Sequence, residues 1–226
     1  ERALELAAER FPGTIVELPT HGGGLPEVSA LLARHPEVEL FASTPSSLAA
    51  RRPGAVHNLL IAPGEAPAAA ARRLALARRL GFARFNFLPA YFVRWTPEQL
   101  RRLAAVFSAL RLVLARWADA GRPVEVVNLS RHGTTPLYND SLTVDTDGEV
   151  YASNLVLAEA VRPRRSLLRL GRVSGPRALK ALPVATSAKV LERAFPAAVL
   201  EDTRRADAAL TAFCRALEED RMAAAR

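Results

Sequence analysis

The stretch that decides the fold runs from Leu80 to Gln99 and reads Leu-Gly-Phe-Ala-Arg-Phe-Asn-Phe-Leu-Pro-Ala-Tyr-Phe-Val-Arg-Trp-Thr-Pro-Glu-Gln. Its first half predicts a buried strand over residues 83–88, because aromatic and apolar residues dominate it. Its second half predicts the start of a helix: Thr96 is a suitable N-cap residue, Pro97 suits the first turn, and Gln99 completes a capping box. A strand followed by a capped helix is the repeating unit of parallel α/β proteins.

The predicted helix after Trp95 carries its apolar residues on one face. They recur at steps of three and four along the chain, which is the period of an amphipathic helix. Gly121 lies just beyond the last of them, at a position where glycine commonly ends a helix. The apolar positions are Leu100, Leu103, Phe107, Leu110, Leu114 and Trp117.

Apolar runs and helical stretches alternate over about the first 130 residues. This alternation predicts a parallel sheet with helices packed against it. No Gly-rich phosphate-binding turn is found, so the pattern fits either an open doubly wound sheet or a portion of a (β/α) barrel. Each predicted strand runs into a polar or turn-forming group, and in a parallel barrel these groups open on one face, where they can converge on a ligand. The predicted strands are residues 14–18, 38–42, 56–62, 83–88 and 124–128.

The pattern changes from about Gly133. Asp147 and Gly148 lie between two short runs of alternating polarity, which predicts a β-hairpin. Short helical pieces follow, and an amphipathic helix is predicted at about residues 203–221. We therefore expect a strand-helix region at residues 1–132 and a small α+β extension at residues 133–226.

The charge of the chain does not by itself indicate a nucleic-acid partner. There are 31 basic and 23 acidic residues, a net charge of +8 over 226 residues. Only two of the basic residues are lysines, and the arginines are scattered at spacings that suit solvated helix faces. No run approaches the roughly 20 apolar residues of a membrane-spanning helix, so a soluble, cytoplasmic protein without a membrane partner is expected. Because Glu1 lies in an apparent helix, we also expect the chain to be part of a longer protein.

The cysteine and the histidines exclude several kinds of site. Cys214 is the only cysteine, so an internal disulfide is impossible and a metal site built from thiolates is nearly so. It lies in an apolar helical pattern and is interpreted as a buried core thiol. His57 lies within a predicted strand and is interpreted as a core histidine, and none of the four histidines has zinc spacing. His21 opens a His-Gly-Gly-Gly string like that of some esterases, but the required Gly-x-Ser-x-Gly turn is missing.

Asn86 is unusual because it lies between phenylalanines in a predicted buried strand, where an unpaired amide would cost about 1 to 3 kcal/mol. We therefore expect a hydrogen-bond partner for it. Three strings taken together resemble the later barrel strands and the start of the C-terminal extension of bacterial radical S-adenosylmethionine (radical SAM) proteins, over about residues 13–160. They are His57-Asn-Leu-Leu-Ile-Ala-Pro-Gly64, the stretch from Leu80 to Thr96, and Tyr138-Asn139 with Asp147-Gly-Glu-Val-Tyr-Ala-Ser-Asn154.

The resemblance implies a partial (β/α) barrel of parallel strands with flanking helices. In the complete protein it implies S-adenosylmethionine (SAM) beside a [4Fe-4S] cluster, whose reductive cleavage of SAM would start radical chemistry on an unidentified peptide or small-molecule substrate. The family's Cys-x-x-x-Cys-x-x-Cys motif is not in this sequence, so we expect the cluster ligands upstream of Glu1 and no turnover by this chain alone. The cofactor-binding positions that the resemblance suggests are Thr20, His21, Ser43, Asn86 and Pro89.

Two other functions stay open on the sequence. One is a binding or scaffold module without a cluster, which uses the barrel mouth for a peptide or another partner. The other is a cofactor-independent α/β enzyme in which His21 or His132 acts as general base.

Overall fold

The chain forms two compact units in a computed structural model. The first unit comprises residues 1–90, 96–134 and 206–226, and the second comprises residues 91–95 and 135–205. The structure describes residues 9, 16–20, 25–130, 143–145, 147–152, 156, 159–172 and 184–224.

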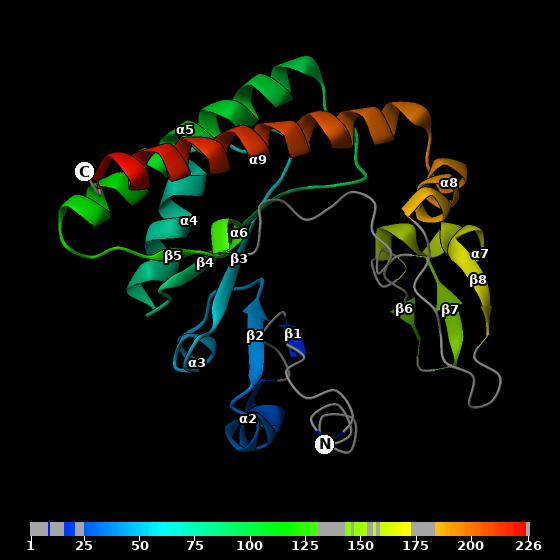
Figure 1. Cartoon of the computed structure of the whole chain (residues 1–226), viewed down its shortest axis with the longest axis horizontal. Coiled ribbons are helices and arrows are strands. Elements are labelled where there is room, and N and C mark those ends of the chain that lie inside the picture. The colour runs from blue at the N-terminus through cyan, green and yellow to red at the C-terminus, as the bar shows by residue number, and fades with distance from the viewer. Residues whose placement is uncertain are drawn as a thin grey trace. The chain divides into compact units, whose positions relative to one another are not determined.

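The first unit is built on a five-stranded parallel sheet (Figure 1). Its spatial order, β1-β2-β3-β4-β5, is also its order along the chain, and every neighbouring pair is parallel. The predicted α/β class and parallel sheet are therefore confirmed. Crossovers between parallel strands are right-handed, so an order without reversal carries the connecting helices to the same face, whereas a doubly wound sheet reverses once. The strands are β1 (Val16–Thr20), β2 (Val38–Ala42), β3 (Val56–Ile61), β4 (Arg84–Pro89) and β5 (Glu125–Val126).

The helices between these strands begin and end at recognisable signals. Thr96 caps the longest of them, since its side chain accepts a bond from the Gln99 amide at 3.2 Å while the Gln99 side chain accepts one from the Thr96 amide at 2.8 Å. The predicted capping box is thus confirmed, and Gly121 follows the helix with φ of +66°. These helices are α2 (Leu25–Arg34), α3 (Ser47–Ala50), α4 (Pro67–Arg79) and α5 (Pro97–Asp119), and α6 (Val127–Ser130) follows β5.

The two faces of the sheet differ, as the alternation along β4 makes plain. Phe85 and Phe87 are fully buried, whereas the residues on either side of them are half-buried. Phe85 lies 6.3 Å from the Trp117 ring of α5, and Phe87 meets the Phe213 ring of α9 (Ala197–Ala224) edge to face at 5.3 Å. The second half of α9 runs beside α5 in this unit (Figure 1). We call the side of Phe85 and Phe87 the helix-covered face and the opposite side the open face.

The fifth strand is shorter than the predicted 124–128, because the backbone turns into α6 at Val127. Asn128, which is 3% exposed, takes over the hydrogen bonds of the missing strand residues. Its side-chain oxygen accepts from the Phe87 amide at 2.8 Å, and its side-chain nitrogen donates to the Phe87 carbonyl at 3.1 Å. The Asn128 side chain therefore bonds to the backbone of β4 at Phe87, where the backbone of β5 no longer does so.

The second unit contains a three-stranded antiparallel sheet in the order β6-β7-β8. The predicted hairpin around Asp147 and Gly148 is confirmed, and Gly148 has the positive φ, +81°, that this turn requires. The third strand, β8, was not predicted. The core of the second unit includes Tyr151, Leu168, Leu191, Phe195 and Leu200. The elements of this unit are β6 (Thr143–Val144), β7 (Glu149–Tyr151), η2 (Glu159–Arg164), α7 (Arg165–Leu168), β8 (Arg169–Arg172) and α8 (Val184–Ala194).

The segment of residues 91–95 is held within the second unit by the start of α9. Asp202 accepts hydrogen bonds from the Arg94 guanidinium at 2.6 Å and from the Trp95 amide at 3.1 Å. Thr203 accepts one from the amide of Phe92, whose φ of +58° is rare for a residue with a side chain. Burial alone would raise the pKa of Asp202, but the bonds from Arg94 and Trp95 outweigh it and hold that pKa below its ordinary value.

No helix in the described part of the chain is long and apolar enough to cross a membrane.

Candidate functional site

The candidate site is the open face of the parallel sheet, where β3 and β4 present polar and part-exposed side chains. Asn58 and Asn86 are paired in the register of the two strands, and both are half-buried. Leu60 and Leu88 lie two residues further toward the carboxyl ends of these strands, and Leu60 is 50% exposed. Side chains two positions apart share a face of a strand, so these four residues form one continuous surface.

A hydrogen bond joins the two asparagines across the strands. The side-chain nitrogen of Asn86 donates to the side-chain oxygen of Asn58 at 2.9 Å. The partner expected for Asn86 is thus Asn58, and the sequence contained a signal for it: Asn58 is likewise a lone amide in an apolar strand. Among the described residues, the side-chain nitrogen of Asn58 and the side-chain oxygen of Asn86 have no hydrogen-bond partner. The pair therefore offers one donor and one acceptor to a ligand.

Arg84 organises the opposite end of the same face, where the strands begin. Its guanidinium makes two bonds to the Glu125 carboxylate, at 2.8 and 2.9 Å, and a longer one to Glu39 at 3.2 Å. It also donates to the Gly54 carbonyl at 2.6 Å. Arg84 thus connects β2, β4 and β5 by charge-assisted bonds, a structural role that sequence reasoning missed.

Two of the suggested cofactor positions, Thr20 and Ser43, lie side by side at the carboxyl ends of β1 and β2. The amide of Ser43 donates to the carbonyl of Thr20 at 2.9 Å, which extends the pairing of the two strands by one bond. Ser43 is exposed and Thr20 is half-buried. A hydroxyl at the carboxyl end of a parallel strand is placed where ligands of α/β proteins bind.

The other suggested positions do not share one surface. Asn86 lies on the open face, whereas Pro89, three residues later, is buried on the helix-covered face beside Ile61. His21, suggested for cofactor binding, and His132, the alternative general base, lie outside the described residues. The structure therefore brings Asn86 to Asn58 and Thr20 to Ser43.

His57 is a core histidine, as expected. It is 1% exposed, its Nδ1 lies 2.9 Å from the carbonyl of Ala42, and its ring packs against Phe82 and Phe85. Burial lowers the pKa of His57, the Ala42 bond works against that shift, and Arg73 adds to it. The ring is therefore neutral near pH 7, with Nδ1 donating its proton to the Ala42 carbonyl.

The described residues do not fit an iron-sulfur cluster. Cys214 is 4% exposed, and burial, with Glu218 and Asp207 nearby, raises its pKa to about 11. It is therefore a protonated thiol near pH 7, whereas cluster ligands are thiolates. Nowhere in the described ranges do three or more histidine, cysteine or acidic side chains gather as a metal site would need.

No protein-family model, curated protein or solved structure matches the chain.

Proposed function

We propose that this chain forms the later strands of a radical SAM barrel, and that the open face of its sheet lines the cavity in which SAM and substrate meet. One observation carries the proposal: five parallel strands follow one another in sequence order, and β3 and β4 present the polar or part-exposed residues Asn58, Leu60, Asn86 and Leu88 on the face opposite to the helices. A barrel has this arrangement, since its helices surround the sheet and its inner face receives the ligand at the carboxyl ends of the strands.

The polarity of the open face around Asn58 and Asn86 argues against a second layer of helices over this part of β3 and β4. A parallel sheet covered on both faces is apolar on both. If such a layer buried Asn58 and Asn86, each unpaired amide group would cost about 1 to 3 kcal/mol. A cavity that holds water or a polar ligand removes this cost.

The residues of the open face fit a ligand with apolar and polar parts, as SAM has. The free donor and acceptor of the Asn58–Asn86 pair could bond its polar edges, and Leu60 and Leu88 could contact its apolar surface. Bound beside a reduced iron-sulfur cluster, SAM would supply radical chemistry on the substrate, and the residues of the open face would hold and orient SAM. The cluster itself would be held by cysteines outside this chain, because Cys214 cannot serve.

Calorimetric titration of the 226-residue chain with SAM tests the proposed surface. Asn86→Leu removes the pair and its free acceptor, and we expect it to weaken SAM binding by about tenfold. Ser108→Leu is a matched control, because Ser108 is an exposed polar residue of α5 that bonds only to the Ala104 carbonyl. Equal affinity in the wild-type chain, the N86L variant and the S108L variant, or no binding by the wild-type chain, would contradict the proposal.

A binding or scaffold module is the second candidate. The free donor and acceptor of the Asn58–Asn86 pair favour it equally, because a partner could bond to them without any cluster. Such a module would use the same open face, but it would bind its partner without forming 5'-deoxyadenosine from SAM. Product analysis therefore separates the two functions, whereas binding alone does not.

A further inference from the structure

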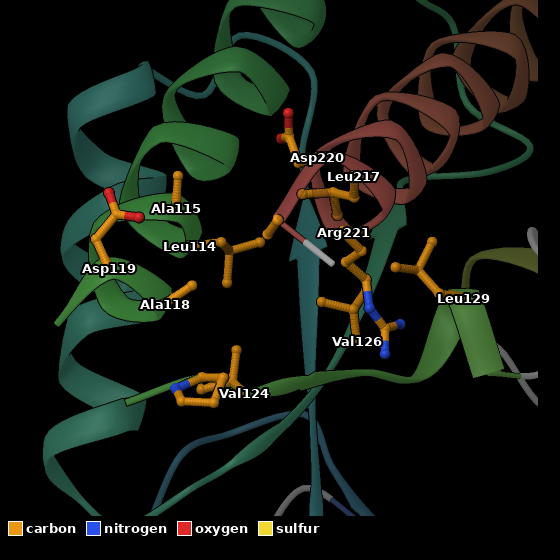
Figure 2. A pocket seen from close by; sticks show the side chains of 12 residues that line it. Leu114, Ala115, Ala118, Asp119, Val124, Val126, Leu129, Leu217, Asp220 and Arg221 are labelled. Carbon is orange, nitrogen blue, oxygen red and sulfur yellow. The ribbon is translucent and has the colours of Figure 1, made fainter. Parts of the chain in front are cut away.

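A second surface for a small molecule lies on the other side of the same sheet. A cavity of about 250 Å³ opens between the end of α5, the β5 strand and the last turns of α9 (Figure 2). Val126, which lines it, is paired with Phe85 in the register of β4 and β5 and so shares the helix-covered face. The sheet therefore separates this cavity from the open face, and a ligand here is independent of the function proposed above.

The cavity has an apolar wall and is large enough to hold an aromatic ring. A cavity of roughly 150 Å³ lined by apolar side chains holds benzene, so a volume near 250 Å³ accommodates a ring system with a short substituent. Alanines of α5 and α9 leave this space open where larger residues would fill it. The apolar lining residues are Leu114, Ala115, Ala118, Pro123, Val124, Val126, Leu129, Leu217 and Ala224.

Three charged residues border the cavity, and they differ in what they already bind. Asp220 is held by Arg111 through two bonds of 2.6 and 2.7 Å, and its carboxylate points away from the apolar wall (Figure 2). Arg221 is exposed and has no hydrogen-bond or ion-pair partner among the described residues. Figure 2 shows its side chain running between Val126 and Leu129, on the opposite side of the cavity from Asp119.

We propose that this cavity binds a small aromatic carboxylate, with its ring among the apolar residues and its carboxylate on the guanidinium of Arg221. Guanidinium and carboxylate match as two parallel hydrogen bonds, which is the geometry that makes arginine the preferred anchor for carboxylates. The side chain of Arg221 is also long enough to follow a ligand into the cavity, whereas the short side chain of Asp119 stays at the surface of α5.

The partial charges at the C-terminal ends of α5 and α9 do not outweigh the preference for a carboxylate. Helix C-termini carry partial negative charge, which favours a cation. The last carbonyls of α5, however, already accept backbone bonds from Ala120, Gly121 and Arg122. In α9, Arg221 itself lies in the last turn and offsets that charge. A carboxylate that bonds to Arg221 therefore meets its guanidinium, while Asp220 is paired with Arg111 and Asp119 lies on the opposite side of the cavity.

Three probes of the same shape test the sign of the ligand: 2-naphthoate, 2-naphthamide and 2-naphthylmethylamine, titrated into the full chain with fluorescence or calorimetric detection. For a ligand of this size we expect a Kd of about 0.1 to 1 mM for the acid. The neutral amide and the amine should bind about tenfold more weakly, because only the acid gains the paired bonds to the guanidinium. Equal binding of the acid and the amide, strongest binding of the amine, or no binding of the acid would overturn the proposal.

Two variants locate the binding within the cavity. Arg221→Gln should weaken naphthoate binding about tenfold and leave naphthamide binding unchanged. Arg215→Gln is its matched control, since Arg215 is another exposed arginine of α9 but does not line the cavity. Ala115→Leu fills the space and should weaken both the acid and the amide by more than about fivefold.

Circular dichroism and tryptophan fluorescence show whether each variant is folded. Arg221 is exposed, so R221Q should fold as the wild-type chain does. Unchanged naphthoate affinity in a folded R221Q variant would refute the role of Arg221, and unchanged affinity in a folded A115L variant would refute the cavity as the site.

Discussion

Replacing Asn128 should strongly destabilise the first unit. Its amide satisfies both backbone groups of Phe87, at 2.8 and 3.1 Å, and is 3% exposed. Asn128→Ala leaves a buried N–H and a buried C=O without partners, at about 1 to 3 kcal/mol each. Allowing for partial access of water, we expect a loss of about 2 to 4 kcal/mol, a large fraction of the roughly 5 to 15 kcal/mol that stabilises a typical domain.

Urea unfolding can isolate this effect because each unit contains one tryptophan. Trp117 lies in the first unit beside Phe85, and Trp95 lies in the second. In a Trp95→Phe background, fluorescence reports the first unit alone. With a urea dependence of about 2 kcal/mol per molar, the expected loss lowers the midpoint by about 1 to 2 M.

Two further variants complete the test of Asn128. Asn128→Asp can still accept from the Phe87 amide but cannot donate to its carbonyl, and it buries a charge, so it should be at least as destabilising as N128A. Ser108→Ala, on the exposed side of α5, should change the midpoint by less than about 0.3 M. A midpoint shift for N128A no larger than that of S108A would refute the role assigned to the side chain.

Two other predictions concern α9. Asp202→Ala should lower the stability of the second unit by about 1 to 3 kcal/mol, read from Trp95 in a Trp117→Phe background, because the Trp95 amide loses its acceptor. Since the pKa of Asp202 is lowered by folding, its contribution is complete above the unfolded pKa and is lost as the pH falls through the folded pKa, so the difference between wild type and D202A should shrink in acid. Cys214, with its pKa raised to about 11 by burial, should resist iodoacetamide at pH 8 in the native chain and react after unfolding in urea; rapid native labelling would contradict its burial.

The parts of the fold that the sequence predicted well depend on local signals. The capping box at Thr96 and Gln99 and the turn at Gly148 involve residues within a few positions of one another, so their types alone determine the geometry. The parallel sheet follows from the alternation of strands and helices, which is also a pattern of neighbouring residues.

The parts that escaped prediction depend on partners far apart in the chain. Asn128 looked like the last residue of a strand, and only the position of Phe87, 41 residues earlier, makes it a substitute for backbone. The bond between Asn58 and Asn86 requires the register of β3 and β4. Asp202 accepts a hydrogen bond from the Trp95 amide, 107 residues away, and the sequence around neither residue predicts the other as its partner.

For the same reason, the sequence indicated where some of the suggested residues lie in the fold and not where others do. Asn86 stood out because an amide among phenylalanines needs a partner, and the structure supplies one. Pro89 carries no such signal, and its side chain lies on the helix-covered face because strand residues alternate. Thr20 and Ser43 were placed correctly at strand ends, since the ends of parallel strands can be read from the apolar runs before them.

Whether the open face lines a radical SAM cavity is tested most directly by measuring the cleavage of SAM. The whole protein encoded by the reading frame that contains this chain should be purified without oxygen, reduced, and incubated with SAM, and 5'-deoxyadenosine should be measured by mass-resolved chromatography. A radical SAM barrel lined by Asn58 and Asn86 should release 5'-deoxyadenosine, and N86L should slow its release at limiting SAM while S108L does not. Intact SAM after incubation with reduced, folded protein would contradict the barrel assignment.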